Sequence, residues 1–309
     1  MLRFWLERVA QMLLVIFCVA TLTFILMRVS PGDPARILLT THNIPASQEA
    51  IDALREEMGL TDSLWSQYIG WLGDVFTWQW GTSYMSKEPV AGELLKRLPA
   101  TLELATAGAL VMLLATCLIG MVTAIFSKGL LDRMGRILAL LGASIPSFWL
   151  GFLLIYFFSV RLGWLPSMGR GGFAHLLMPA VTLGLGLGAV YARVLRTNML
   201  EMNNQNFVKA SRARGLSKGR IFIFQVFKHA FLPILSMLGT SFAFMLGGNV
   251  IVETIFSWPG VGKYIIEAIT ARDYPVIQGY VVFTSFLFVA IHLAVEVFYV
   301  RLDPRLRAS

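Results

Sequence analysis

The sequence has 309 residues, of which 56% are hydrophobic and only 14% are charged, and its formal net charge at pH 7 is +8. A soluble domain of this length needs far more charge on its surface, so the composition predicts an integral membrane protein. The positive charge is concentrated in short loops between apolar runs, where membrane topology and anionic lipid already explain it. We therefore expect no binding of nucleic acid.

Six apolar runs are long enough to cross a bilayer, which takes about 20 residues of helix. They predict an all-α integral membrane protein with six transmembrane helices. A proline and several glycines interrupt the fourth run, and we interpret these glycines as sites of close helix packing because no strand precedes them as in a nucleotide-binding turn. The predicted spans are residues 9–27, 102–126, 137–160, 176–194, 231–252 and 279–300.

The distribution of Lys and Arg predicts the orientation in the membrane. With the N-terminus inside, the inner segments hold sixteen of the 26 basic residues and only four of the 18 acidic ones. The positive-inside rule therefore predicts that both termini are cytoplasmic. The long basic loop at residues 193–230 then also faces the cytoplasm, where ATP is found.

The chain is expected to have three parts: an N-terminal transmembrane helix (residues 1–30), a long outer segment (31–98) and a core of five transmembrane helices (99–309). We expect the first helix to be retained, because no small-residue cleavage site of the signal-peptide type follows it.

Two helices are predicted in the outer segment. Ser47 is placed to cap a helix that stops at Gly59, and residues 64–75 have the apolar spacing of an amphipathic helix. Tryptophan favours the membrane interface, and four tryptophans lie close together here. The segment either rests on the outer leaflet and receives a substrate-delivery protein, or caps the helix bundle. The four are Trp65, Trp71, Trp78 and Trp80.

The second and third spans each contain one informative feature. The second span is expected to open at Leu98 and Pro99, which places Glu103 near its N-terminus, where the helix dipole favours a carboxylate. We expect a structural cap there rather than a substrate contact. Pro146 in the third span removes a backbone hydrogen bond and predicts a kink.

A polar and basic stretch at residues 207–233 separates two strongly apolar runs. Residues 207–214 contain neither Gly nor Pro and are rich in good helix formers, so they predict a short surface helix. Gly215 ends this helix, because glycine adopts the left-handed turn of a C-cap without a Cβ penalty. The helix is either an idle solvated element or a docking element for a soluble partner.

The residues from Lys209 to Gly215, followed by Leu232 and Pro233, resemble the EAA loop of ABC importer permeases in the form typical of the peptide and nickel branch. Two departures from the general pattern are that Lys209 replaces the glutamate that names the loop, and that Gly215 lies eighteen residues before Pro233. Both are usual in the peptide and nickel branch. The resemblance implies the type I ABC importer permease fold, with a coupling helix in this loop.

The same resemblance implies the partners. They are a second homologous permease subunit, two ATP-binding subunits, an extracytoplasmic substrate-binding protein and membrane lipid, in a bacterial inner membrane. This chain is expected to bind no cofactor, since ATP and Mg would be held by the ATP-binding subunits. The residues implied in ATPase coupling are Phe207, Lys209, Ala210, Ser211, Arg212, Ala213, Arg214, Gly215 and Leu216.

Outer loops extend the resemblance over residues from about 80 to 309. The turn at residues 164–172 and the segments at 253–262 and 272–279 are similar to outer loops of this branch. The first turn and the loop at 258–264 look more like nickel-type members, which favours nickel or a nickel chelate as cargo. A dipeptide or oligopeptide is the alternative.

Polar residues within or next to the spans are candidates for the substrate path. Asn249 and Glu253 are four residues apart and share a helix face, as do His292 and Glu296. For the second pair we expect helix packing rather than a cation site, and for His175 an interfacial role rather than a metal contact. We assign no metal site. The six candidates are Glu103, His175, Asn249, Glu253, His292 and Glu296.

No motif for chemistry occurs in the chain: it has no Walker-type loop, no zinc-protease motif and no nucleophile elbow. We therefore expect a transport subunit that carries no catalysis itself. Two other classes stay open. An ion-coupled secondary transporter needs ionisable or carbonyl-lined sites near the midplane, where the spans carry almost no charge. An intramembrane enzyme needs a nucleophile with its base or a metal triad inside the spans, and His292 with Glu296 is too little for either.

Overall fold

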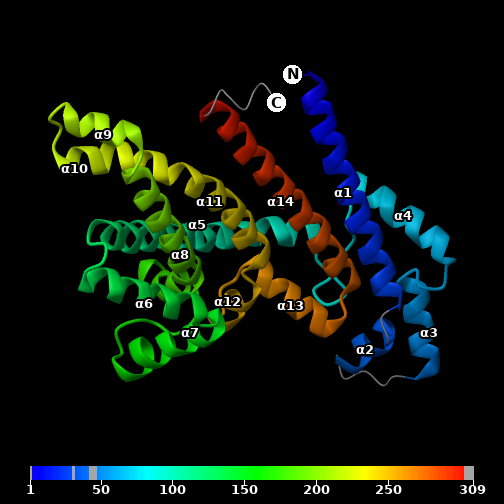
Figure 1. Cartoon of the computed structure of the whole chain (residues 1–309). Coiled ribbons are helices and arrows are strands. Elements are labelled where there is room, and N and C mark those ends of the chain that lie inside the picture. The colour runs from blue at the N-terminus through cyan, green and yellow to red at the C-terminus, as the bar shows by residue number, and fades with distance from the viewer. Residues whose placement is uncertain (1, 30–31, 42–46, 303–309) are drawn as a thin grey trace. The chain divides into compact units, whose positions relative to one another are not determined.

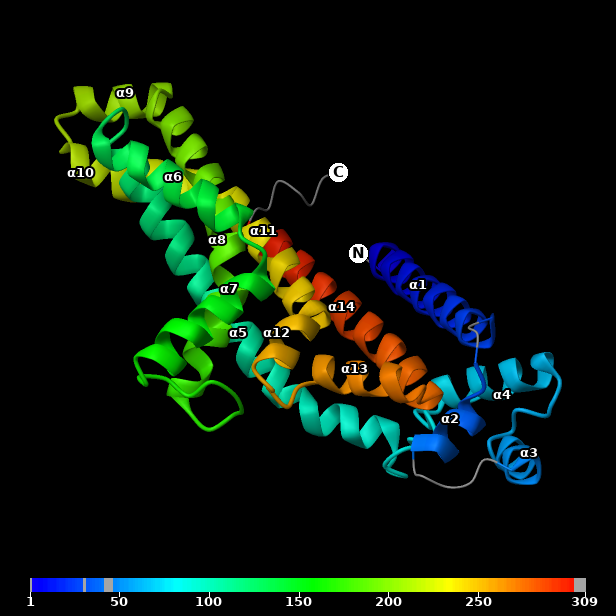
Figure 2. The same cartoon turned by 90° about the horizontal axis from the view of Figure 1, so that it is seen from below.

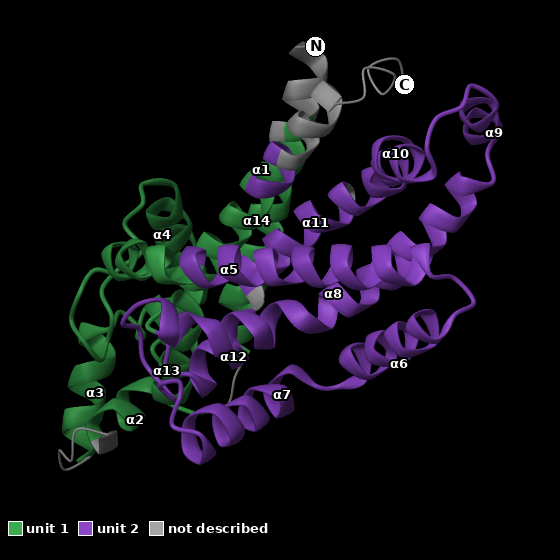
Figure 3. Cartoon of the chain, turned by 90° about the vertical axis from the view of Figure 1, so that its left-hand side faces the viewer, with its two compact units in different colours: residues 1–101, 259–290 green, residues 102–258, 291–309 purple. Residues whose placement is uncertain are grey.

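The computed structural model describes residues 2–29, 32–41 and 47–302 (Figure 1). Apart from one isolated β-bridge between Thr82 and Pro89, the regular structure of these residues is helical. The chain forms two compact units, coloured separately in Figure 3. Unit 1 consists of Met1–Thr101 and Pro259–Ala290, and unit 2 consists of Leu102–Trp258 and Ile291–Ser309.

The described part of the chain contains five helices long and apolar enough to cross a membrane, and six if a bent pair counts as one span. Each of the six predicted apolar runs coincides with one of these helices over most of its length, and the fifth run continues beyond α11 (Lys228–Gly248) into α12 (Val250–Ile255). The helices are α1 (Leu2–Val29), α5 (Val90–Ile125), the pair α6 (Leu130–Ser144) and α7 (Ser147–Leu154) with η1 (Ile155–Arg161), α8 (Phe173–Asn203), the run of α10 (Lys218–Ile221), η2 (Phe222–Phe227) and α11 (Lys228–Gly248), and α14 (Tyr274–Leu302).

Unit 1 contains the outer segment and its short helices, α2 (Pro34–Thr41), α3 (Gln48–Glu57), α4 (Leu64–Phe76) and α13 (Val261–Ala271). The prediction for α3 is confirmed: the side chain of Ser47 accepts a hydrogen bond from the amide of Ala50, and Gly59 follows the helix with φ +63°. The amphipathic helix predicted over residues 64–75 is also confirmed as α4.

Aromatic side chains join α4 to α1 within unit 1. The ring of Phe24 stacks on Trp71 at 5.6 Å and meets Tyr68 edge-on at 5.3 Å. The Tyr68 hydroxyl lies 2.8 Å from the hydroxyl of Thr21. In contrast, Trp65 is 70% exposed. Only part of the predicted interfacial aromatic set is therefore available to lipid.

Trp80 also differs from the expectation that the four tryptophans lie at a membrane interface. It is buried, stacks on Trp78 at 5.0 Å and lies 6.0 Å from the ring of Phe283 on α14. Close by, the Ser83 hydroxyl donates to the buried carboxylate of Asp273 at 2.5 Å. These contacts hold the loop before α5 against the N-terminal end of α14.

Helix α5 begins at Val90, eight residues before the opening expected at Leu98, and Pro99 lies inside it. The first turns are stabilised by Glu93, whose carboxylate accepts hydrogen bonds from Lys96 at 3.1 Å and from Arg97 at 3.0 Å. A proline within a membrane helix is tolerated where neighbouring groups satisfy the freed backbone. The expected opening at Leu98 is therefore wrong, because the helix already begins at Val90 and continues through Pro99.

Glycines of α8 form the packing surface of unit 2, as predicted for the fourth span. A Cβ atom on Gly188 would lie 2.7 Å from the Cβ of Ala115, and one on Gly184 would lie 2.8 Å from the backbone nitrogen of Met112. No side chain fits at such distances, so α8 and α5 approach each other closely only because both positions are glycine.

The predicted kink at Pro146 is a complete break. Helices α6 and α7 meet at an angle of 104° on either side of Ile145 and Pro146. A single missing hydrogen bond produces a kink; here the extended backbone of Ile145, with ψ 122°, ends α6 altogether. At the other end of α6, the buried carboxylate of Asp132 accepts hydrogen bonds from Arg196 on α8 at 2.8 and 3.0 Å.

Candidate functional site: the basic loop and the polar groups of unit 2

The basic loop contains α9 (Asn206–Ala213), which follows α8 and precedes α10. Gly215 ends α9 with φ +79°; its amide donates to the carbonyl of Arg212 at 3.0 Å, and the amide of Leu216 donates to the carbonyl of Ser211 at 3.2 Å. These two bonds form the Schellman arrangement, which requires one residue in the left-handed region. The predicted short helix and its glycine stop are confirmed.

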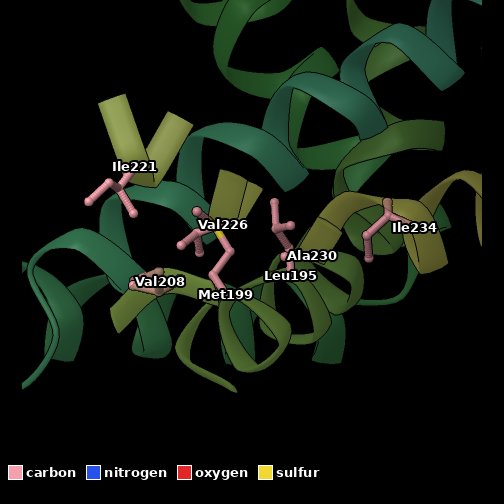
Figure 4. Close-up of a cluster of buried hydrophobic side chains, with 8 residues drawn as sticks. Leu195, Met199, Val208, Ile221, Val226, Ala230 and Ile234 are labelled. Carbon is pink, nitrogen blue, oxygen red and sulfur yellow. The ribbon is translucent and has the colours of Figure 1, made fainter. Parts of the chain in front are cut away.

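Two side chains anchor α9 to unit 2. Val208 is fully buried, and the hydroxyl of Ser211 donates to Oε1 of Gln225 at 2.8 Å. Figure 4 shows Val208 among side chains from α8, η2 and α11, in a group that we call the inner cluster. The inner cluster consists of Ala124, Leu195, Met199, Val208, Ile221, Val226, Ala230 and Ile234.

The opposite face of α9 is exposed and basic. The side chains of Ser211 and Leu216 do not belong to this face, since Ser211 is buried and half-buried Leu216 packs on the inner cluster. Arg212 donates to Oδ1 of Asn203 at 2.8 Å, which orients its guanidinium. The remaining predicted coupling residues are exposed: Phe207, Lys209, Ala210, Arg212, Ala213, Arg214 and Gly215.

Two of the segments predicted to face the cytoplasm, residues 127–136 and the basic loop, lie side by side in unit 2. A cavity of about 370 Å³ is lined by Ile125 at the end of α5, by Ser127 from the turn after it, and by Arg212 and Lys218 from the basic loop. Figures 1 and 2 show α9 and α10 at the same end of unit 2 as the turn between α5 and α6. This arrangement is what loops on one side of a membrane require.

Glu103 has a different role from the cap expected of it. Because α5 begins at Val90, Glu103 lies more than three turns inside the helix, beyond the range of a dipole effect at its start. Its carboxylate instead accepts hydrogen bonds from Arg170, with Nη2 at 2.6 Å and Nε at 2.8 Å. The expected cap is therefore wrong, and Glu103 binds the turn that precedes α8.

His175 lies in the first turn of α8, directly after that turn. The imidazole is half-buried against Gly171, where an added Cβ would lie 2.8 Å from the ring. The amide of Gly169 donates to the carbonyl of Phe256 at 2.8 Å, so the turn is fixed to the end of α12 (Val250–Ile255). The structure thus brings together two outer loops that were singled out separately in the sequence.

Asn249 and Glu253 are both buried, with exposed fractions of 3% and 0%. Asn249 forms the junction between α11 and α12, and its carbonyl accepts a hydrogen bond from the amide of Glu253 at 2.9 Å. The side-chain Nδ2 and Oδ1 of Asn249 have no hydrogen-bond partner among the described residues. Among the six candidates for the substrate path, Asn249 is thus the one whose buried side-chain atoms are found without a hydrogen-bond partner among the described residues.

His292 and Glu296 lie on α14, as the sixth span predicted. The His292 side chain is exposed on the surface of the chain. The side chain of Glu296 lies outside the described residues, so the packing role expected for the pair stays a prediction.

Reasoning from the sequence overlooked the residues that hold the basic loop in place. Val208 and Gln225 fix α9, and the ion pair between Asp132 and Arg196 joins α6 to α8. Val208 did carry a signal, since it is the one aliphatic β-branched residue within the predicted surface helix. The partners of Asp132 and Gln225 carried none, because they are distant in the sequence.

Family models match both parts of the chain. The model described as "Binding-protein-dependent transport system inner membrane component" matches residues 116–308, and its N-terminal companion matches residues 1–105. A putative peptide transport system permease protein of Brucella abortus (strain 2308) is 38% identical over 98% of both chains. The glutathione transport system permease protein GsiC of Escherichia coli (strain K12) is 33% identical over 99% of both chains.

Solved structures of similar fold are more distant in sequence. A chain of the MetNI methionine ABC transporter in an inward-facing conformation superposes with a TM-score of 0.52 at 17% identity, covering 66% of this chain and 95% of that one. A chain of an amino acid ABC transporter solved with histidines gives 0.52 at 19% identity, covering 68% and 94%. At such identities the likeness concerns the fold alone, which is that of a type I importer permease.

Proposed function

Since this chain belongs to the family of binding-protein-dependent transport system inner membrane components, and is thus a multi-pass permease subunit of a bacterial ABC importer, we propose that its cargo is a peptide. The observation that carries this proposal is the identity of 38% over 98% of both chains with a relative named as a peptide transport permease. GsiC, which is named for glutathione, a tripeptide, supports the same class of cargo. Nickel, which the outer loops favoured, has no such support from the comparisons.

Uptake by cells tests the cargo. Cells that lack the gene and cells with the gene restored are given a radiolabelled tripeptide or radiolabelled nickel, each with the other compound in excess. We expect tripeptide uptake that depends on the gene and is unaffected by nickel. Nickel uptake that depends on the gene and is not reduced by excess peptide would refute the peptide proposal and restore the nickel hypothesis.

The family implies an ATPase and a substrate-binding protein as partners. We further propose that α9 is the coupling helix that docks on the ATPase subunit. Two features support this role: its outer face is exposed and basic, while Val208 and Ser211 attach its inner face to unit 2. A helix held in this way transmits a push from a partner to the membrane helices instead of yielding locally.

The remaining assembly is proposed on the same basis. A second homologous permease subunit and two ATP-binding subunits would complete the importer, and both termini of this chain would be cytoplasmic. The side-by-side position of the two inner loops at the cavity near Ser127 and Lys218 supports this topology. ATP and Mg would be bound by the ATP-binding subunits, and this chain would supply the path and the coupling surface.

Gly215 provides a direct test of the coupling role. Its φ of +79° suits glycine, whereas a β-branched residue there is strained by roughly 1–2 kcal/mol and would unwind the end of α9. No atom would meet an added Cβ, so the strain is purely conformational. We expect Gly215→Val to insert normally and to abolish uptake, and Gly215→Asn, which tolerates the left-handed region, to retain it.

Gly219 is the matched control. It lies in the same loop, also has open space around it, and sits within α10, where the backbone is an ordinary right-handed helix. Gly219→Val is expected to transport normally. Normal uptake by Gly215→Val would show that the geometry of α9 is not needed for coupling.

A further inference from the structure

Unit 2 contains a second cavity, distinct from the one near the basic loop. Its volume is about 360 Å³, within the range of small-molecule sites in proteins. It is bounded by the break between α6 and α7, by α8, and by the junction of α11 and α12. Its wall is mainly apolar, with Leu150, Leu187 and Phe244 among the side chains that form it.

Asn249 is the polar group that stands out on this wall. The residue is only 3% exposed, yet neither Nδ2 nor Oδ1 has a hydrogen-bond partner among the described residues. Buried polar groups in native proteins are nearly always hydrogen-bonded, and an orphaned one calls for an explanation such as a missing ligand. Thr182, which also lines the cavity, is by contrast satisfied, since its hydroxyl donates to the carbonyl of Met178 at 2.8 Å.

The same wall contains two breaks in membrane helices. Helix α7 begins at Ser147 after Pro146, which caps the helix with no side-chain hydrogen bond. Asn249 itself separates α11 from α12. Transporters commonly place substrate sites where helices are interrupted, because the freed backbone groups are tolerated only beside a cavity or another polar group.

We propose that Asn249 binds the peptide backbone of the cargo as it passes through this cavity. A carboxamide presents an NH2 donor group and a C=O acceptor side by side, which matches the C=O and N–H groups of a peptide. The apolar wall accepts cargo side chains without regard to their identity. This inference rests on the proposed peptide cargo and names the residue that recognises it.

Backbone N-methylation of the cargo tests the assignment. A radiolabelled tripeptide and its analogue methylated on the peptide nitrogens differ in their N–H donors and have the same side chains. We expect the ratio of the analogue's KM to the tripeptide's KM to exceed one in the complete wild-type importer, with contributions from the binding protein and from Asn249. Asn249→Leu, which keeps the branched shape and removes the amide, is expected to lower this ratio about tenfold, the effect of roughly one hydrogen bond.

The ratio separates a binding role from a folding defect. Poor insertion of a variant lowers uptake of both peptides equally and leaves the ratio unchanged, whereas loss of the amide changes the ratio itself. Asn249→Ser, which keeps a hydrogen-bonding group in a smaller side chain, should give an intermediate ratio if the leucine variant fails to insert. Thr254→Val is the control, because Thr254 is exposed on α12 and its hydroxyl donates to the carbonyl of Val250 at 2.7 Å.

Three outcomes would overturn the inference. The first is an unchanged ratio in Asn249→Leu alongside normal peptide uptake, which would leave the proposed cargo intact. The second is a reduced amount of assembled permease pair with an unchanged ratio, which would make Asn249 a contact of the second permease subunit. The third is an absence of peptide uptake in the wild type, which would refute the proposed cargo and this inference together.

Discussion

Val208→Ala is the most direct test of how α9 is held. Val208 is fully buried in the inner cluster, and the substitution deletes two methyl groups. The lost burial and the cavity left behind together cost about 2–3 kcal/mol. The other anchor, the hydrogen bond from Ser211 to Gln225, contributes only about 1 kcal/mol. The substitution therefore removes most of the free energy that docks α9.

Hydrogen exchange measures this loss locally. The amides of α9 exchange when the helix opens, and a cost of 2–3 kcal/mol corresponds to an opening about 30 to 150 times more frequent. In Val208→Ala we expect the amides of α9 to lose protection by this factor, and the amides of α8 to keep the protection of the wild type. In the assembled importer, binding-protein-stimulated ATP hydrolysis should persist while peptide uptake falls.

Lys209→Ala is the matched control, since Lys209 is the exposed neighbour of Val208 on the same helix. Its α9 amides should keep the protection of the wild type. Equal protection in Val208→Ala and Lys209→Ala would refute the idea that the inner cluster anchors the basic loop.

Two further predictions concern stability. Asp132→Ala leaves Arg196, whose side chain is only 22% exposed, without its carboxylate and should lower the free energy of unfolding by about 3 kcal/mol. Arg136→Ala removes an ion pair of 3.4 Å at an arginine that is 55% exposed, and should lower it by less than about 1 kcal/mol. Equal shifts in the thermal unfolding of the two variants would contradict this prediction. Burial raises the pKa of Tyr84 to about 12 from its ordinary value of 10. The neutral phenol is thus favoured in the folded state, so its contribution is complete below pH 10 and is lost as the pH rises through 12. Tyr84→Phe should make unfolding less steep in pH over this range, and an unchanged alkaline profile would count against the burial of the phenol.

Local features were predictable from the sequence because they depend on residues close together in the chain. The apolar runs located the spans, since a bilayer sets the length of a helix that crosses it. Ser47 and Gly59 located the ends of α3, and Gly215 located the end of α9, because caps satisfy the terminal backbone groups of their own helix. The family resemblance, read from the same local motifs, identified the class of protein.

Contacts between distant segments decided the rest. Trp80 is buried against Phe283 of α14, and Val90 at the start of α5 packs closely on Gly279 of the same helix; no local pattern reveals these contacts. The pairing of Glu103 with Arg170 likewise joins residues 67 positions apart. Such contacts determine whether a polar residue acts as a cap, a tether or an unsatisfied group.

The candidate site shows the same division. The sequence alone determined that a basic helix ends at Gly215 and that Asn249 lies near the end of a span. Only the tertiary structure decided which face of α9 is buried, and that Asn249, whose side-chain amide has no partner among the described residues, lines a cavity. Hydropathy and turn propensity act over a few residues, whereas burial and hydrogen-bond satisfaction depend on which helices come together.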